Sequence, residues 1–339
     1  MRLSAAVAAP PWSVDARITA AVAHWWAQHA STVAPTGLDG VGVAFSGGAD
    51  STALLLAACA VWPQRVHALH VHHGLQAAAD TFAAHAARVC ARLAVPLTVL
   101  HVQARPAPRQ SPEEAARRAR YRALAEAART HRLAAVLLGH HAQDQAETVW
   151  LALSRGAGLP GLAGMPALRW HDGVAFGRPL LALDGAALRQ ALAAAGVPWV
   201  EDPSNTSAAY TRNRIRQRLL PAWEATFGPG AWAAVARSAR HAAQAQTLLD
   251  DLAALDLQHI GEPPSLTALR ALSSARAINA LRHWLRMRHG ASGSDAQWQE
   301  VARQITAART RGHRIELRLG QGTLWRAGDY LHWKPAAVT

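Results

Sequence analysis

Short apolar runs alternate with amphipathic segments in the first part of the chain. The apolar runs are rich in Val and Leu and have the length of strands, and the segments between them have a helical period. Strands are predicted over 41–45, 66–71, 97–102 and 134–139, and helices over 51–61, 76–93 and 112–131. Because continuous apolar strands that alternate with helices belong to covered parallel sheets, the pattern predicts an α/β fold: a Rossmann-like parallel sheet with helices on both faces.

The pattern changes after the turn at Gly228-Pro229-Gly230. The elements predicted here are two helices, at 231–256 and 266–289, and a β-hairpin in which Gly320-Gln321-Gly322 joins a strictly alternating run at 314–319 to a second run that ends at Trp325. The length of the chain allows two domains. We therefore predict a first domain over residues 1–226 and a smaller, mostly helical C-terminal domain with a short β-hairpin over 227–339.

A glycine loop follows the first predicted strand. Its sequence is Ser46-Gly47-Gly48-Ala49-Asp50-Ser51, and an apolar helix begins there. A strand, glycine turn and helix aim unpaired backbone N–H groups at one point, where an anion binds. A carboxylate at Asp50 would repel a phosphate unless Mg²⁺ lay between them, so we predict a magnesium–nucleotide site with Asp50 as the metal ligand. The alternative is a tight turn capped by Asp50 or Ser51; a Walker A loop is excluded because Lys334 is the only lysine.

Polar residues also follow other predicted strands. His70 ends the second strand, and His140 and His141 follow the fourth. The carboxyl ends of parallel strands share one edge of a sheet, where ligands bind. Asp144 and Glu147 come next and would share one face of a helix. They suit either a capping arrangement at the helix start or a site for Mg²⁺ or an amine.

The charge of the chain favours a phosphate-rich partner. The net charge is +13, of which residues 1–202 carry +4 and residues 203–339 carry +9. A basic excess in one part suits nucleic acid, although coding bias is an alternative reason for the abundance of Arg. Cys59 and Cys90 lie far apart in predicted helices, which argues against disulfides and Cys-based metal sites. The sequence contains no apolar run long enough to span a membrane and no signal-peptide pattern. We therefore expect a cytoplasmic protein without membrane partners.

Several motifs resemble one family. The loop Ser46–Ser51 looks like the signature of the PP-loop ATP pyrophosphatases. The blocks that resemble the tRNA(Ile)-lysidine synthetases, a family within that group, are His140–Thr148, Glu113–Tyr121, Arg178–Leu181 and Glu201–Arg216. One departure is Gln143, where many members have a second Asp. A further C-terminal domain of larger members is expected to be absent.

The resemblance implies ligation of free L-lysine to carbon 2 of the wobble cytidine of an isoleucine tRNA, through an adenylated tRNA. ATP is consumed, AMP and pyrophosphate are released, and Mg²⁺ is needed. It implies a PP-loop ATP-binding catalytic domain over 1–226 and a basic tRNA substrate-binding domain over 227–339, and it is compatible with a homodimer. The implied site residues are Asp50, Asp144, Glu147 and Arg212 for catalysis; Ser46, Gly47, Gly48, Ala49, Asp50, Ser51, His70, Arg117 and Arg120 for ATP; Asp144, Glu147 and Asn213 for lysine; and Arg216, Arg282, Arg286, Arg311 and Arg314 for tRNA.

Two other functions fit parts of the sequence. Thiolation at carbon 2 of tRNA needs a sulfur-carrying Cys or an iron–sulfur cluster, and Cys59 and Cys90 form no CxxC pair. A non-catalytic RNA-binding module would not need the complete glycine loop together with Asp144 and Glu147. Both alternatives are therefore less favoured than lysidine formation.

Overall fold

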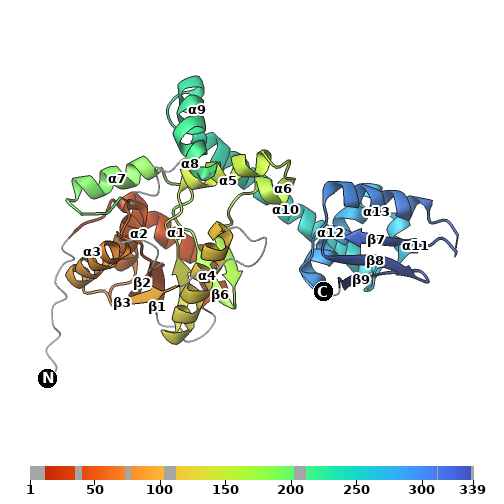
Figure 1. Cartoon of the computed structure of the whole chain (residues 1–339), viewed down its shortest axis with the longest axis horizontal. Helices are drawn as coiled ribbons and strands as arrows, with labels where there is room; N and C mark the ends of the chain where they lie inside the picture. The colour runs from red at the N-terminus through yellow and green to blue at the C-terminus, as the bar shows by residue number, and fades with distance from the viewer. Residues whose placement is uncertain are drawn as a thin grey trace. The chain divides into compact units, whose positions relative to one another are not determined.

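The computed structural model describes residues 12–34, 40–72, 78–102, 112–201, 211–310 and 312–336. The chain divides into two compact units, Met1–His241 (unit 1) and Ala242–Thr339 (unit 2), and the division falls within helix α10, Trp232–Ile260 (Figure 1). The domain boundary predicted between residues 226 and 227 lies earlier, at the end of α9 (Leu220–Phe227), and stays a prediction. Within the described ranges, every helix is too short or too polar to cross a lipid bilayer.

Unit 1 is built on a six-stranded sheet with the strand order β3-β2-β1-β4-β6-β5. The strands are β1 Gly40–Ala44, β2 Val66–His72, β3 Leu97–His101, β4 Leu133–Leu137, β5 Leu168–His171 and β6 Val174–Gly177. All neighbouring pairs are parallel except β5–β6. The predicted Rossmann-like sheet is therefore confirmed, with an antiparallel edge strand added.

The edge hairpin β5–β6 is closed by a two-residue turn. Asp172 and Gly173 join its strands with φ of 49° and 73°. Two consecutive residues with positive φ match the twist of a two-residue hairpin turn. The hairpin adds its second strand, β6, in parallel beside β4.

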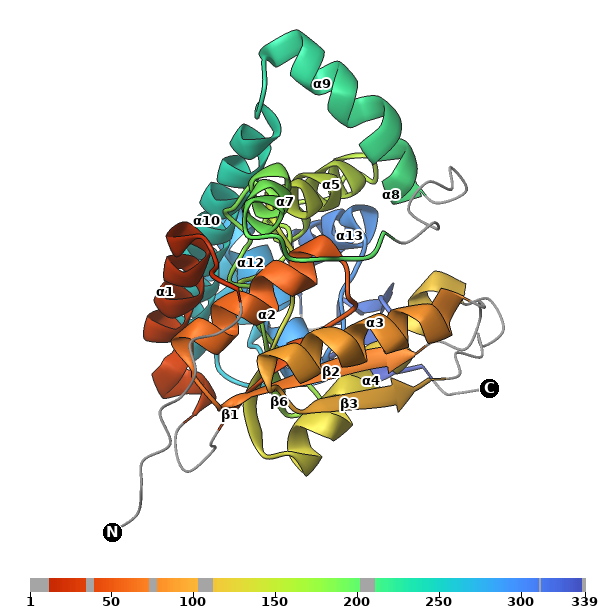
Figure 2. The ribbon, with the colours of Figure 1, turned by 90° about the vertical axis from the view of Figure 1, so that its left-hand side faces the viewer.

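Helices cover both faces of the sheet, as predicted. The main helices of unit 1 are α1 Ala16–Val33, α2 Ala49–Val61, α3 Ala78–Leu93, α4 Pro112–Thr130, α5 Ala142–Leu153 and α7 Gly185–Ala194. Figure 2 shows α2 and α3 on one side of the strands and α4 on the other. Successive residues along β4 point to the two faces of the sheet. Ala135 and Leu137 pack in the core under α2, and Val136 and Leu138, the residue after the strand, pack in the core under α4.

The last part of unit 1 carries an irregular helical segment. The short helix α6 spans Leu159–Leu162, and α8 spans Thr211–Arg214. A π-helical turn, Ile215–Leu219, joins α8 to α9. π-helical turns are rare in proteins, and those that occur often lie at functional sites. Trp150 of α5 packs with Leu220 and with Trp232 of α10, which holds this segment beside α5.

Unit 2 has its own core. Its helices and strands after α10 are α11 Leu266–Ala271, α12 Ser274–His289, α13 Asp295–Ala307, β7 Glu316–Leu319, β8 Gly322–Ala327 and β9 Tyr330–Pro335. The prediction of one helix over 266–289 is wrong, because Leu272 is extended (φ −85°, ψ 162°) and the Ser273 side chain caps a new helix. The predicted hairpin is confirmed as β7–β8, and β9 extends it to three strands.

Candidate active site

The glycine loop has the conformation of an anion site. Gly47 has φ +86°, and a Cβ atom there would lie 3.1 Å from Cδ2 of His85 and 3.2 Å from Cγ2 of Val200. Only glycine combines this φ with such a close approach. The hydroxyl oxygens of Ser46 and Ser51 lie 3.0 Å apart, and Ser51 also donates to the Gly48 carbonyl. The loop is thus fixed at the start of α2, where the first backbone N–H groups have no partner within the helix.

The loop after β4 lies against this helix start. A Cβ atom at Gly139 would come within 3.0 Å of the backbone carbonyl of Asp50. This close backbone approach brings His141 to both acidic motifs. Its Nε2 atom lies 3.6 Å from Oδ2 of Asp50 and 3.5 Å from Oδ2 of Asp144. One imidazole therefore bridges the carboxylate of the glycine loop and the first carboxylate of α5.

Charges across this bridge shift its groups in opposite directions. Burial alone would lower the pKa of His141, but the carboxylates of Asp50 and Asp144 outweigh it and raise that pKa. Burial alone would raise the pKa of Asp50, but His141, with smaller contributions from Arg189 and Arg216, lowers it. The ion-paired form of His141 and Asp50 is therefore stabilised in the folded protein.

The second carboxylate of α5 faces a cation. The side chain of Glu147 is fully buried, and its Oε1 atom accepts a hydrogen bond of 2.8 Å from Nε of Arg216. Another nitrogen of that guanidinium lies 3.4 Å from Oδ1 of Asp144. Burial raises the pKa of Glu147, although Arg216 partly opposes this. Asp144 also accepts the backbone N–H of His141 at 3.0 Å, so the cap of α5 is His141 with Asp144 as its third helical residue, and a cap at Asp144 with Glu147 three residues later is not formed.

Two buried carboxylate oxygens at this site stay available. Oδ1 of Asp50 and Oε2 of Glu147 have no hydrogen-bond partner within the part of the chain that the structure describes. Buried carboxylate oxygens are costly to leave unsatisfied. The arrangement is therefore suited to ligands that carry positive charge, such as a metal ion or an ammonium group.

A cluster of guanidinium groups surrounds Tyr121. Arg117 and Arg120 lie over its ring, 5.1 and 5.6 Å from the centroid. Arg178, which is 2% exposed, donates to the hydroxyl of Tyr121 at 3.2 Å and to the Pro166 carbonyl at 2.8 Å. Burial lowers the pKa of Arg120 and that of Arg178. Buried cations of this kind suit a phosphate-rich ligand.

His140 connects the guanidinium cluster to α5. Burial lowers the pKa of His140 to about 3; Asp144 opposes this shift, and the three guanidinium groups of the cluster add to it. His140 is therefore neutral at physiological pH. Arg212 also acts on the cluster, because it contributes to lowering the pKa of Arg120, and it donates to the Thr148 hydroxyl at 3.3 Å. Cations and carboxylates thus meet on either side of the α5 start.

Comparisons with known proteins identify the family. Residues 22–223 match the profile described as "PP-loop domain", and residues 265–332 match "TilS substrate binding domain". A tRNA(Ile)-lysidine synthase of Polaromonas naphthalenivorans strain CJ2 is 54% identical over 88% of this chain and 90% of its own length. The chain belongs to the tRNA(Ile)-lysidine synthase family.

Other similarities are weaker. The tRNA(Ile)-lysidine synthase of Bordetella parapertussis strain 12822 is 44% identical over 81% of this chain and 83% of its own length. Among solved structures, the U34-tRNA thiolase NcsA of Methanococcus maripaludis has a TM-score of 0.52 at 15% identity, covering 66% of this chain and 79% of that chain. At that identity the likeness shows a common fold only.

The structure places most of the site residues predicted for the lysidine synthase family close to the motifs described above. His70 contacts the residue that precedes the glycine loop. Its Nδ1 atom lies 2.8 Å from the carbonyl oxygen of Phe45, which comes just before Ser46. Asn213 is buried on α8, one residue after Arg212. Arg216 was assigned to tRNA, and the structure pairs it with Glu147 and Asp144, although its side chain stays partly exposed.

Three of the four predicted tRNA contacts of unit 2 are engaged in ion pairs. Arg282 lies 3.6 Å from a carboxylate oxygen of Asp295, Arg286 lies 2.5 Å from one of Asp250, and Arg314 is paired with Glu316. The remaining prediction, Arg311, lies outside the described residues. Each pair would have to share or lose its carboxylate before the cation could bind a phosphate.

Gln143 has a structural role. Its Nε2 atom donates to Oδ1 of Asp184 at 2.7 Å, and its Oε1 atom accepts the backbone N–H of Gly185 at 2.9 Å. These bonds tie the start of α7 to α5. A Cβ atom at Gly185 would lie 2.9 Å from Cε1 of His141, so the start of α7 also packs closely against the bridging imidazole.

Sequence reasoning missed the roles of Arg178 and His141. Arg178 was noted only as part of a motif, and its burial depends on Tyr121, 57 residues earlier. His141 was placed at the correct sheet edge, but its contact with two carboxylates requires the close packing at Gly139. The glycine itself was the available signal, since a glycine at a strand end often marks a close backbone approach.

Proposed function

We propose that the protein ligates L-lysine to carbon 2 of the wobble cytidine of an isoleucine tRNA, with ATP as the co-substrate. The observation that carries the proposal is the bridge of His141 between Asp50 of the glycine loop and Asp144 of α5, which joins the nucleotide motif to the amine-binding motif. The high identity to named tRNA(Ile)-lysidine synthases supports the same assignment.

The first step needs groups that hold a triphosphate. The carbonyl oxygen of the cytidine attacks the α-phosphorus of ATP, the bond between the α-phosphorus and its bridging oxygen breaks, and pyrophosphate leaves. The start of α2 offers backbone N–H groups to the phosphates, and Arg117 and Arg120 offer positive charge. Arg212, from α8, would add to the neutralisation of the developing charge.

The second step needs a base. The ε-ammonium of lysine must lose a proton before its nitrogen can attack carbon 2; the bond from carbon 2 to the AMP oxygen then breaks and AMP leaves. Glu147 suits this role because burial raises its pKa and its Oε2 atom has no partner within the described residues. Asp144 and Asn213 would hold the ammonium in place.

Asp50 fits a magnesium ion. Its Oδ1 atom is buried without a hydrogen-bond partner in the described part of the chain, and carboxylate oxygens are preferred Mg²⁺ ligands. Within the described residues, no group of three or more His, Cys, Asp or Glu side chains could hold a metal ion without other ligands. Phosphate oxygens and water would supply the other ligands, as is usual for Mg²⁺. Bound there, the ion would neutralise phosphate charge.

Thiolation, the alternative within the PP-loop group, is not favoured by the cysteines. Burial raises the pKa of Cys59 to about 11 and that of Cys90 to about 12. A sulfur-carrying cysteine acts as the thiolate, and both of these stay protonated at physiological pH.

The decisive experiment is mass spectrometry of the wobble nucleoside. The enzyme is incubated with isoleucine tRNA, ATP, Mg²⁺ and isotope-labelled lysine, and the tRNA is digested to nucleosides. We expect cytidine to gain the mass of labelled lysine minus water. Unmodified cytidine after incubation with folded enzyme would contradict the proposal. Pyrophosphate release that does not depend on lysine, with sulfur added to the tRNA, would indicate a thiolase, and no release would indicate a binding module.

A further inference from the structure

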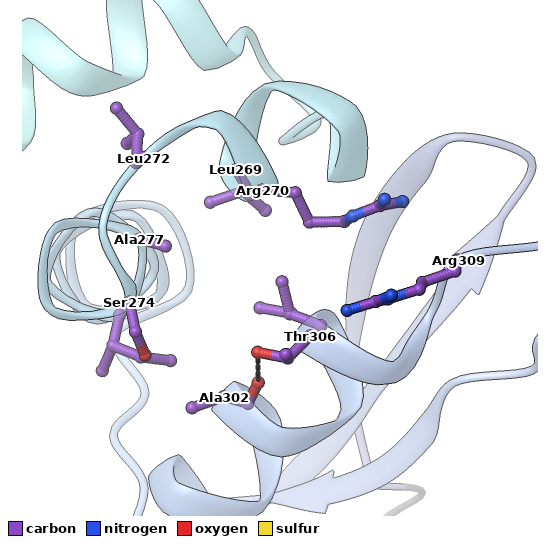
Figure 3. Close-up of a pocket in the computed structure, with 10 residues that line it drawn as sticks. Leu269, Arg270, Leu272, Ser274, Ala277, Ala302, Thr306 and Arg309 are labelled. Atoms are coloured by element: carbon purple, nitrogen blue, oxygen red, sulfur yellow. Dashed lines mark hydrogen bonds between the residues drawn. The ribbon is translucent and has the colours of Figure 1, made fainter.

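A cavity of about 380 Å³ lies wholly within unit 2, between α11, α12 and α13. Its walls include the apolar side chains of Leu272, Ile278 and Ile305. Arg270 and Arg309 lie on the same side of the pocket in Figure 3. The volume falls in the usual range for small-ligand sites, which combine apolar walls with a few polar groups.

Arg270 and Arg309 differ from most arginines of unit 2. The arginines paired with a carboxylate are Arg276, Arg282, Arg286, Arg288, Arg303 and Arg314. Neither Arg270 nor Arg309 has a carboxylate partner within the ranges that the structure describes. Their positive charge at the cavity mouth is therefore left for a ligand from outside the chain.

A backbone contact fixes the position of Arg270. Its Nη1 atom donates to the carbonyl oxygen of Ala308, the C-terminal cap of α13, at 2.9 Å. The carbonyl belongs to the residue just before Arg309, so the bond brings the guanidinium of α11 to the end of α13. Arg270 has further N–H donors after making this bond. An anion bound at the cavity mouth would be attracted by both guanidinium groups.

We propose that this cavity binds one nucleotide of the tRNA substrate, with its phosphate at Arg270 and Arg309 and its ribose and base against the apolar wall. The inference rests on the proposed function, since it names where unit 2 holds the tRNA. Proteins recognise folded RNA through phosphate contacts and through unstacked bases placed in apolar or guanidinium-lined sites. The two guanidinium groups at the mouth and the apolar side chains of the wall supply both kinds of contact, with polar atoms forming the larger part of the exposed lining.

The test measures tRNA affinity by fluorescence anisotropy over a series of salt concentrations, with the full-length protein. The variants are Arg270→Gln, Arg309→Gln and the double variant. We expect the double variant to raise the Kd for tRNA roughly tenfold and to lower the slope of log K against log salt by about one, because one phosphate contact is lost. Arg303→Gln is the matched control: it removes one charge from α13, the helix that ends just before Arg309, but from a residue already paired with Glu300.

A further variant tests the role of the cavity volume independently of the two positive charges. Thr306→Trp would fill the opening without changing charge, since Thr306 is an exposed cavity residue of α13 whose hydroxyl bonds only to the preceding turn. We expect it to weaken tRNA binding while leaving the salt slope unchanged. Thermal unfolding of each variant checks that unit 2 is folded.

The outcomes distinguish the inference from the proposed function. If wild-type protein forms lysidine but the double variant and Arg303→Gln bind tRNA with the same Kd and salt slope, the inference is wrong and the proposed function stands. If the arginine variants bind tRNA more weakly but Thr306→Trp binds normally, a phosphate contact exists and the nucleotide cavity is refuted. If wild-type protein binds tRNA at this cavity without forming lysidine, the proposed function fails while the inference holds.

Discussion

Nε of Arg216 donates a hydrogen bond of 2.8 Å to Oε1 of Glu147, across the contact between α5 and the π-helical turn that follows α8. This cation lies at the carboxylate that lysine is proposed to use. Because Oε2 of Glu147 keeps no partner in the described residues, Glu147 can hold Arg216 and an ammonium at the same time. Arg216 would therefore orient the base, and its assignment to tRNA stays a prediction.

Replacing Glu147 by Gln should separate the two chemical steps. The amide keeps the shape of the side chain but cannot accept a proton from the lysine ammonium. We expect incorporation of labelled lysine to fall roughly 10²-fold or more, while pyrophosphate release continues. Both products are measured in the same reaction.

Glu300→Gln provides the control for Glu147→Gln, because Glu300 is also paired with an arginine, Arg303, but lies in unit 2. It should leave both products near wild-type levels. Equal loss of pyrophosphate release and lysine incorporation in Glu147→Gln would show that Glu147 serves adenylation or folding rather than amine activation.

Asp50→Asn should destabilise the protein more in mild acid than in mild base. The pKa of His141 is raised in the folded state by Asp50 and Asp144, despite its burial. A raised histidine pKa contributes stability below the unfolded value of about 6.5, and that contribution is lost as the pH rises through the folded value. Asp50 itself is ionised at both pH values compared, because its pKa is lowered.

The measurement is the free energy of unfolding in urea at about pH 5.5 and about pH 8.5, for wild type and Asp50→Asn. The loss in the free energy of unfolding caused by Asp50→Asn should be larger at the lower pH. Asp80→Asn is the matched control: Asp80 lies 3.0 Å from Nε2 of His72 but is 89% exposed, so solvent screens the pair. The same difference at both pH values would mean that His141 does not respond to Asp50.

The sheet and the glycine loop could be predicted because their signals are local. A run of apolar residues such as Leu133–Leu137 is buried on both faces and needs no distant information to be recognised as a strand. The loop at Gly47 and Gly48 is likewise determined by consecutive residues. The rule that ligands lie beyond the carboxyl ends of parallel strands then brought Asp50 and Asp144 to the same site.

The pairing of charges could not be predicted because it depends on distant partners. Arg286 was expected to contact tRNA, but Asp250, 36 residues earlier, neutralises it. Arg270 drew no attention in the sequence, and the fold leaves it without a carboxylate, within the described ranges, at a cavity mouth. Composition gives the excess of positive charge, while the three-dimensional structure decides which cations are free to bind a phosphate.

Gly47→Ala should impair both stability and ATP binding. Gly47 has φ +86°, and a Cβ atom would meet His85 and Val200 within 3.2 Å. A non-glycine residue in this region costs about 1–2 kcal/mol, to which the contact adds. Gly173→Ala is the control, since Gly173 has φ +73° but nothing within 4 Å of its Cβ position. We expect Gly47→Ala to show the larger drop in thermal stability and a raised KM for ATP, measured by pyrophosphate release; equal effects on stability and an unchanged KM would contradict a tight loop.

Gln143→Asp, which introduces the residue that the family resemblance led us to expect, should destabilise this chain. The Nε2 atom of Gln143 donates to Asp184 at 2.7 Å, so an aspartate there would place two carboxylates together and leave the Gly185 N–H with an altered acceptor. We expect a loss of about 1–3 kcal/mol in the free energy of unfolding. The double variant Gln143→Asp with Asp184→Asn should regain much of this loss, because the amide introduced at position 184 can donate to the new carboxylate. That amide can also still accept the Ala186 N–H that now caps α7. Urea unfolding and lysine incorporation are measured for all variants. If Gln143→Asp alone is as stable and as active as wild type, the bonds from α5 to the start of α7 do not position His141.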